Sequence, residues 1–243
     1  YSPDGNLMAT ASDDHAIRIW DNTSGKLLQT LPGHSSYVNY LRFSPSGKLL
    51  LTASYDSTLR IWDLRTARLL QTIRDHDDVV YMGDFSRDEK IVVSASADKK
   101  MIISEIASGK KMMEKEMGDL VLETQFSPNG QLLLVLLQSH KALLFDSTAS
   151  RQLLEVKGPG NFNMSATISQ DNKYLFTSSG PDLHIWDIKS GKIWQKATDE
   201  MTKPGAKTID LIVPATDNSV VATASADSLI RIWDIRTGRL LHR

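Results

Sequence analysis

The sequence predicts an all-β fold made of repeated four-stranded antiparallel sheets, and three observations support this prediction. Related segments begin at residues 1, 43, 85, 126, 168 and 212, so the chain repeats every 41 to 44 residues. Within a copy the apolar residues alternate with polar ones or form short runs, a pattern typical of strands rather than helices. A five-residue segment that ends in Trp-Asp also returns in nearly the same register, at 17–21, 59–63, 183–187 and 230–234.

The second blade, whose expected strands run from residue 37 to residue 73, shows the pattern most clearly. Residues 37–43 predict an inner strand, and a turn of the form Ser-Pro-Ser-Gly follows it. Residues 48–54 and 58–62 predict two further strands around a tight turn, and residues 68–73 predict the outermost strand. Twisted sheets of this size bury both faces by packing radially against copies of themselves, so the architecture predicted for 1–243 is a β-propeller. Its copies are placed approximately at 1–42, 43–84, 85–125, 126–167, 168–211 and 212–243.

The first copy lacks nearly all of its inner strand, while the last copy ends on its outermost strand. A ring without that inner strand would expose its core along the central channel. We therefore expect the remainder of a longer polypeptide to complete the first blade and to supply a seventh.

Composition argues against several classes of function. Twenty-eight Lys and Arg residues against twenty-nine Asp and Glu give a net charge of −1, which provides no basic field for nucleic acid. The chain has no cysteine, and its longest apolar run is six residues, Leu132 to Leu137. We therefore expect no thiolate metal site, no membrane span and no nucleic-acid partner. The expected location is intracellular, in the cytoplasm.

Gly33-His34, the stretch Thr52-Ala53-Ser54-Tyr55-Asp56 and the Trp-Asp dipeptides carry a family resemblance. On these motifs the chain resembles the WD-repeat, or β-transducin-like, family along its whole length. The resemblance implies a propeller that most often has seven blades and that binds proteins or peptides. It implies neither a cofactor nor a metal.

The resemblance also implies a buried hydrogen-bonded chain within a blade, formed here by His34, Thr52, Asp56 and Trp62. Because these residue types recur in several copies, a structural role is favoured over acid–base catalysis. The fourth and fifth copies are expected to depend on packing instead. The corresponding residues of the other copies are Thr10, Asp14 and Trp20; His76, Ser94 and Asp98; and Thr223, Asp227 and Trp233.

Two classes of propeller enzyme can be compared by spacing. Sialidase-type boxes place the tryptophan five residues after the aspartate, whereas Asp14 to Trp20 and Asp56 to Trp62 are six apart. A quinoprotein-like motif is approached once, from Asp187 to Trp194, and is one residue short. We therefore expect no catalytic residue in this chain.

In the resembled family, the loop that enters the inner strand and the tight turn open onto one face, which usually binds partners. Tyr37 and Tyr55 fall on this face in the same blade, and tyrosine is favoured at interface hot spots. The stretch from Asp199 to Gly205 lengthens one such loop and is interpreted as a tolerated insertion. The remaining candidate contacts, from the other copies, are Val79, Ala97, Leu120 and Phe162.

The predicted function is that of a non-enzymatic scaffold for protein complexes. One alternative is a regulatory sensor within a larger signalling protein, whose NTPase, kinase, protease or ubiquitin-ligase module would lie outside this segment. A propeller enzyme is the other alternative, and the Asp–Trp spacing argues against it.

Overall fold

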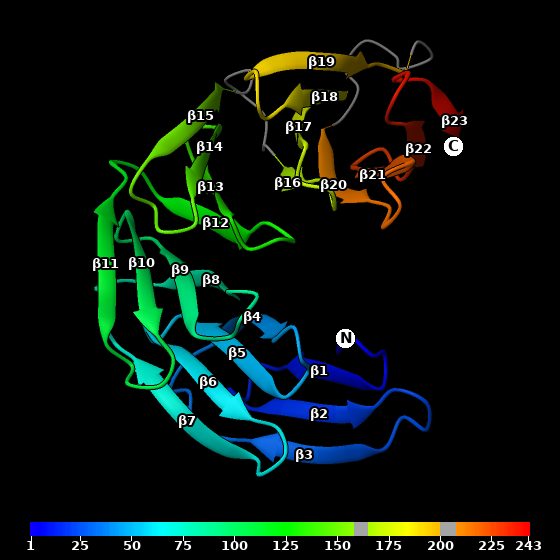
Figure 1. Ribbon diagram of the computed structural model, residues 1–243. Helices are drawn as coiled ribbons and strands as arrows, with labels where there is room; N and C mark the ends of the chain where they lie inside the picture. Colours follow the sequence, from blue (N-terminus) through cyan, green and yellow to red (C-terminus); the bar gives the residue numbers. More distant parts are fainter. Residues whose placement is uncertain (158–164, 200–207) are drawn as a thin grey trace. The chain divides into compact units, whose positions relative to one another are not determined.

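The computed structural model describes residues 1–157, 165–199 and 208–243, and every regular element in these ranges is a β-strand (Figure 1). The strands form six sheets that follow one another along the sequence. The first sheet has three strands, and each of the other five has four. The predicted all-β fold of repeated antiparallel sheets, with no inner strand in the first copy, is confirmed.

The chain divides into two compact units, Tyr1–Gln125 and Phe126–Arg243, and the first unit contains three whole sheets. In each of these sheets the hydrogen-bonded strand order follows the sequence order. The first sheet is β1 (Leu7–Ala11), β2 (Ile17–Asp21) and β3 (Leu27–Leu31). The second is β4 (Val38–Phe43), β5 (Leu49–Ser54), β6 (Leu59–Asp63) and β7 (Arg68–Ile73). The third is β8 (Val80–Phe85), β9 (Ile91–Ser96), β10 (Lys100–Glu105) and β11 (Lys111–Glu116).

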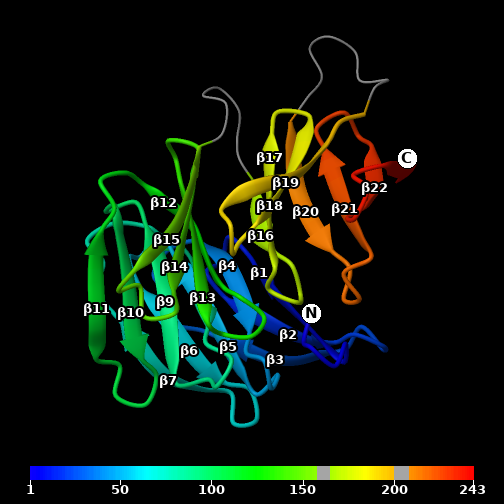
Figure 2. The ribbon, with the colours of Figure 1, turned by 45° about the horizontal axis from the view of Figure 1, so that its top comes forward.

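The other three sheets repeat this order (Figure 2). The boundary between the two units falls within β12 (Val121–Phe126). The fourth sheet continues with β13 (Leu132–Leu137), β14 (Lys141–Asp146) and β15 (Gln152–Lys157). The fifth is β16 (Ala166–Ile168), β17 (Tyr174–Ser179), β18 (Asp182–Asp187) and β19 (Lys192–Ala197). The sixth is β20 (Ile209–Pro214), β21 (Val220–Ser225), β22 (Ile230–Asp234) and β23 (Leu240–His242).

The second sheet buries both of its faces, which explains why β5 is an almost unbroken apolar run. Leu50 packs into a core shared with Ile19 of the first sheet. Leu51, its neighbour in sequence, packs into a different core with Val92 of the third sheet. Successive side chains of a strand point to opposite faces, so a sheet buried on both sides needs apolar residues at consecutive positions.

The second unit is built in the same way. One core joins Leu134 and Leu144 of the fourth sheet to Leu175 of the fifth. Another joins Phe176, also from the fifth sheet, to the fully buried Trp233 of the sixth. Leu175 and Phe176 therefore divide between two cores as Leu50 and Leu51 do.

The turn that follows an inner strand requires a left-handed backbone at one position. Gly47 adopts φ +71° there, a conformation that costs glycine little because it has no Cβ. In the third copy the corresponding residue is Glu89, which adopts φ +55°. Its carboxylate accepts hydrogen bonds from the backbone N–H and the hydroxyl of Ser46, so it ties this strained turn to the second sheet.

Candidate functional site

The second sheet contains a buried chain of hydrogen bonds that links four side chains. The indole N–H of Trp62 donates to the Thr52 hydroxyl over 3.0 Å. Thr52 Oγ1 lies 2.7 Å from Nε2 of His34, and Nδ1 of that imidazole lies 2.8 Å from Asp56 Oδ2. All groups are satisfied in series when Thr52 donates to Nε2 and the protonated Nδ1 donates to the carboxylate.

Burial and neighbouring hydrogen bonds set the protonation states of His34 and Asp56 in this hydrogen-bonded chain. Burial lowers the pKa of His34, and the hydrogen bond to Asp56 offsets this only in part, so the imidazole is neutral at pH 7. Burial alone would raise the pKa of Asp56, but hydrogen bonds from Thr58, Ser35 and His34 lower it to about 2. A neutral imidazole that donates to a carboxylate fixes the loop carrying His34 against the tight turn.

Close packing around this chain explains the glycine that precedes the histidine. Gly33 has φ +145°, and a Cβ at this position would lie 2.5 Å from Nη1 of Arg60 and 3.4 Å from the Trp62 ring. Arg60 is itself buried, with Nη2 3.8 Å from Asp56 Oδ2. A larger residue at position 33 would therefore displace the arginine.

The third sheet keeps the polar part of the chain without the tryptophan. His76 lies 2.8 Å from Asp98 Oδ2 through Nδ1 and 2.7 Å from Ser94 Oγ through Nε2. Burial lowers the pKa of His76 as it does that of His34. Ser104 occupies the tryptophan position, and its buried hydroxyl has no hydrogen-bond partner within the described ranges.

The remaining sheets keep smaller parts of the arrangement. The Trp–Thr bond recurs as Trp20 to Thr10 (2.8 Å) and as Trp233 to Thr223 (2.9 Å). The turn aspartates of these two sheets, Asp14 and Asp227, form ion pairs with an arginine four residues later, Arg18 and Arg231 respectively. In the fourth sheet a fully buried Phe145 takes the tryptophan position.

The expectation that the fifth copy depends on packing alone was wrong. The indole N–H of Trp186 donates to Thr177 over 2.9 Å, so the fifth sheet keeps this part of the hydrogen-bonded chain. The motif search missed it because this copy has no Gly-His pair and its turn differs from the others. The Trp-Asp ending of β18 was the signal that could have indicated it.

Sequence analysis also missed an ion cluster in the sixth sheet. The buried Asp199, which was assigned to a tolerated insertion, accepts from Nε of Arg231 at 2.9 Å and from Nε of Arg243 at 3.0 Å. Arg231 also pairs with Asp227 at 2.7 Å. The recurring arginine in the second position of β2, β6 and β22 was the available signal.

Charged side chains of the inner strands meet in the first unit. Nε of Arg42 on β4 lies 3.0 Å from Oδ1 of the buried Asp84 on β8. Burial raises the pKa of Glu123 to about 7; the positive charge of Arg42 opposes this rise, and the negative charge of Asp84 adds to it. The three residues belong to three successive inner strands, so the charges that act on Glu123 come from other copies.

The two tyrosines selected from the sequence lie together at the tight-turn end of the second sheet. Their ring centroids are 6.3 Å apart with an interplanar angle of 87°, and Tyr37 and Tyr55 are 53% and 50% exposed. The Tyr55 N–H and the Ser54 hydroxyl both donate to the Tyr37 carbonyl, at 2.9 and 2.8 Å. The backbone beneath the two rings is therefore held by hydrogen bonds.

Two further aromatic residues extend this pair. The ring of His15, from the tight turn of the first sheet, makes an edge-to-face contact with Tyr37 at 5.6 Å. Tyr81 belongs to β8 of the next sheet, and its carbonyl accepts a hydrogen bond from the Asn39 side chain of β4 at 2.8 Å. Its pKa is raised by burial and further by the negative charges of Tyr55 and Asp78. We call His15, Tyr37, Tyr55 and Tyr81 the tyrosine surface.

The other contact candidates are less exposed or lie outside the described residues. The Ala97 N–H donates to the Val79 carbonyl at 2.9 Å, which repeats in the third sheet the bond between Tyr55 and Tyr37. Val79, Ala97 and Leu120 are only partly exposed, and Phe162 lies outside the described residues. Among the contact candidates that the structure describes, Tyr37 and Tyr55 are therefore the two with large exposed side chains.

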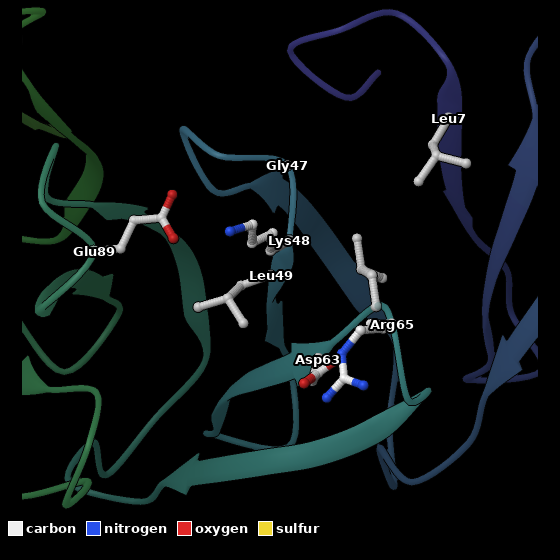
Figure 3. Close-up of a pocket in the computed structure, with 8 residues that line it drawn as sticks. Leu7, Gly47, Lys48, Leu49, Asp63, Arg65 and Glu89 are labelled. Carbon is white, nitrogen blue, oxygen red and sulfur yellow. The ribbon is translucent and has the colours of Figure 1, made fainter.

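A cavity of about 490 Å³ lies at the end of β5 where Leu49 begins the strand (Figure 3). Tyr55 follows the other end of β5. Its lining combines two cations and two carboxylates with leucine side chains, so it favours no single class of ligand. The lining residues are Leu7, Gly47, Lys48, Leu49, Asp63, Leu64, Arg65 and Glu89.

In residues 1–157, 165–199 and 208–243, no group of three or more His, Cys, Asp or Glu side chains is arranged to hold a metal ion. Within the same ranges, no helix is long and apolar enough to span a membrane.

Repeated four-stranded antiparallel sheets, several with a hydrogen bond from tryptophan to threonine, identify the chain as a β-repeat protein. Comparison with known proteins identifies its family. The family described as "WD domain, G-beta repeat" matches residues 1–21, 25–63, 67–103 and 209–234, about half of the chain. The chain therefore belongs to the WD40 repeat family, as the resemblance of its motifs indicated. Proteins of this family generally act as scaffolds for protein interactions and are generally non-catalytic.

Individual relatives match over about one repeat. A 43-residue stretch is 42% identical to the human U5 small nuclear ribonucleoprotein 40 kDa protein, covering 18% of this chain and 12% of that protein. Nuclear distribution protein PAC1 of Mycosarcoma maydis is 51% identical over 39 residues, or 16% of this chain and 9% of the relative. An uncharacterized WD repeat-containing protein of Nostoc sp. is 44% identical over 41 residues, which are 17% of this chain and 3% of the relative. The chain thus spans only a small part of these curated relatives.

Proposed function

We propose that this chain is a non-enzymatic platform that holds a protein or peptide partner on the tyrosine surface. Membership of the WD40 family supports the general role, and the tyrosine surface supplies a place for it. Both ring nitrogens of His34 and His76 bond to neighbouring side chains, and both imidazoles are buried, so a substrate has no access to them in the folded sheets.

One observation carries this proposal, namely two half-exposed and perpendicular tyrosine rings on a hydrogen-bonded backbone. Large aromatic side chains that are already fixed in position lose little conformational entropy when a partner binds. Their hydroxyl groups can hydrogen-bond at the edge of an interface while the rings supply apolar area.

The test is affinity capture with the intact protein, comparing wild type with the double variant Tyr37→Ala/Tyr55→Ala. Partners identified by mass spectrometry should be lost selectively from the variant. The rings are half exposed, so the melting temperature should change little. A large fall in melting temperature would instead assign the rings to the fold.

A matched control is available on the outer strands of the same region. Leu28 on β3 and Leu70 on β7 are 47% and 46% exposed, and Leu28→Ala/Leu70→Ala removes a comparable exposed apolar area away from the tyrosine surface. The control variant should retain every partner. If the tyrosine variant also retains every partner, the interface lies elsewhere and the assignment of this surface is wrong.

The cellular setting is part of the same proposal. The name of the human relative places that protein in a small nuclear ribonucleoprotein, a multi-component assembly. We expect this chain, like that relative, to hold a place in an intracellular multi-protein complex. Fractionation of native extracts, followed by size-exclusion chromatography, should recover the chain in a particle larger than the free protein.

A further inference from the structure

The tyrosine surface forms a row whose two ends are negatively charged. At one end the exposed Asp13 lies in the turn that the His15 N–H closes by donating to the Ser12 carbonyl at 2.9 Å. At the other end the exposed Asp78 lies in the loop that enters β8, where its carbonyl accepts a hydrogen bond from the Ser96 hydroxyl at 3.3 Å, at the tight-turn end of the third sheet. Within the described ranges neither Asp13 nor Asp78 takes part in an ion pair, whereas their neighbours Asp14 and Asp77 do.

Most cations near the row are already neutralised. Arg18 is paired with Asp14, and Nζ of Lys100 lies 3.1 Å from Asp77 Oδ2. The exposed Arg74 shares its loop with three aspartates, at positions 75, 77 and 78. The local balance is therefore acidic, although the whole chain is close to neutral.

The faces of the aromatic rings attract cations, as the carboxylates do. The face of a phenol ring carries the negative part of its quadrupole and attracts ammonium or guanidinium groups. Tyr37 and Tyr55 are perpendicular, so their faces point in different directions, and each ring is half exposed. Two ring faces and two carboxylates that form no ion pair within the described ranges thus all favour a positively charged ligand.

We propose that the tyrosine surface binds a peptide segment carrying lysine or arginine, with the cation over the ring of Tyr37 or Tyr55 and with Asp13 and Asp78 supplying the flanking charge. This inference rests on the proposed function and specifies the chemistry of the partner. An acidic peptide or a nucleic-acid backbone would meet like charge at both ends of the row, so these ligands are disfavoured.

The test uses the full chain with ring-labelled tyrosine and follows all six tyrosines by NMR. The probe is the peptide acetyl-Gly-Arg-Gly-Lys-Gly-amide, and the matched control is acetyl-Gly-Gln-Gly-Gln-Gly-amide. Saturable shifts should appear at Tyr37, Tyr55 and Tyr81 with the cationic probe. They should be absent at Tyr1 and Tyr174, which serve as internal controls.

Two variants separate the contributions of charge and ring. Asp13→Asn/Asp78→Asn should weaken the probe about threefold to fivefold and reduce its salt dependence, because two exposed carboxylates are lost. Tyr37→Ala/Tyr55→Ala should weaken it at least about fivefold, whereas Tyr37→Phe/Tyr55→Phe should keep most of the affinity because the ring faces remain.

Each outcome bears on one of the two proposals. Equal shifts from the glutamine peptide, shifts spread over all six tyrosines, or no saturable shift would overturn the cationic preference. If affinity capture still shows partners lost from Tyr37→Ala/Tyr55→Ala, the interaction surface stands and only the chemistry assigned to its partner is wrong. If neither experiment responds to this variant, both proposals fail.

Discussion

Replacing Thr52 by valine tests whether the buried hydrogen-bonded chain stabilises the second sheet. The substitution keeps the shape of the side chain but removes the hydroxyl that accepts from Trp62 and bonds to His34. Trp62 is 2% exposed and His34 6%, so water cannot readily replace the lost partner. Each buried polar group left without a partner costs roughly 1–3 kcal/mol, so we expect a loss of about 3 kcal/mol of unfolding free energy.

Two threonines in other sheets provide graded controls. Thr223→Val leaves a single buried group, the indole N–H of the fully buried Trp233, and should cost about 1–2 kcal/mol. Thr10→Val leaves the indole of Trp20, which is only partly buried and can turn to water, so its cost should stay below about 1 kcal/mol.

The assay is urea unfolding followed by NMR through the indole N–H resonances of the five tryptophans. Because the chain has two compact units, a single bulk transition is not assured, and separate resonances report on separate sheets. The Trp62 resonance should show the largest shift in midpoint in the Thr52→Val protein. Equal losses for all three variants would mean that the number of orphaned buried groups does not set the cost.

Three further predictions concern charged groups. Glu123→Gln should stabilise the protein increasingly as pH rises from 5 to 8, by about 3 kcal/mol at pH 8, because burial raises the pKa of Glu123 to about 7 and the wild-type carboxyl must ionise inside the fold. Urea midpoints measured across this pH range test the predicted gain in stability. In that background stability should fall as pH drops below 6.5, the ordinary pKa of histidine, because burial lowers the pKa of His34 and His76 and the unfolded imidazoles take up protons first. A flat urea midpoint between pH 7.5 and 5 would contradict this. Asp199→Asn should lower the free energy of unfolding by about 3 kcal/mol, as followed through the Trp233 indole resonance, because it leaves two arginines without their shared buried carboxylate. An unchanged urea midpoint would show that this carboxylate does not stabilise the sheet.

The strands could be predicted closely because their signal is local. The predicted outer strand of the second copy, residues 68–73, matches β7, and the predicted strand 48–54 begins one residue before β5. Alternation of side chains and the turn residues that bound it are properties of short segments. Repetition then supplied the same information six times over.

Contacts between copies could not be predicted in this way. His15 meets Tyr37 and Arg42 meets Asp84 only because neighbouring sheets bring their turns and inner strands together. Asp199 and Arg243 are 44 residues apart and lie outside the repeated motif, so no spacing pointed to them. Equivalent positions also differ in effect, since Val79 and Ala97 occupy the places of Tyr37 and Tyr55 with much smaller side chains.

The division of Leu50 and Leu51 between two cores affects how substitutions combine. In a double-mutant cycle, Leu50 should couple to Ile19 and Leu51 to Val92, residues tens of positions away, while the two leucines couple only weakly to each other. Adjacent residues of such a strand can therefore be substituted almost independently, and a substitution that compensates for lost packing is expected in the neighbouring repeat. Whether a substitution in one repeat is tolerated therefore depends on the side chains of the neighbouring repeat.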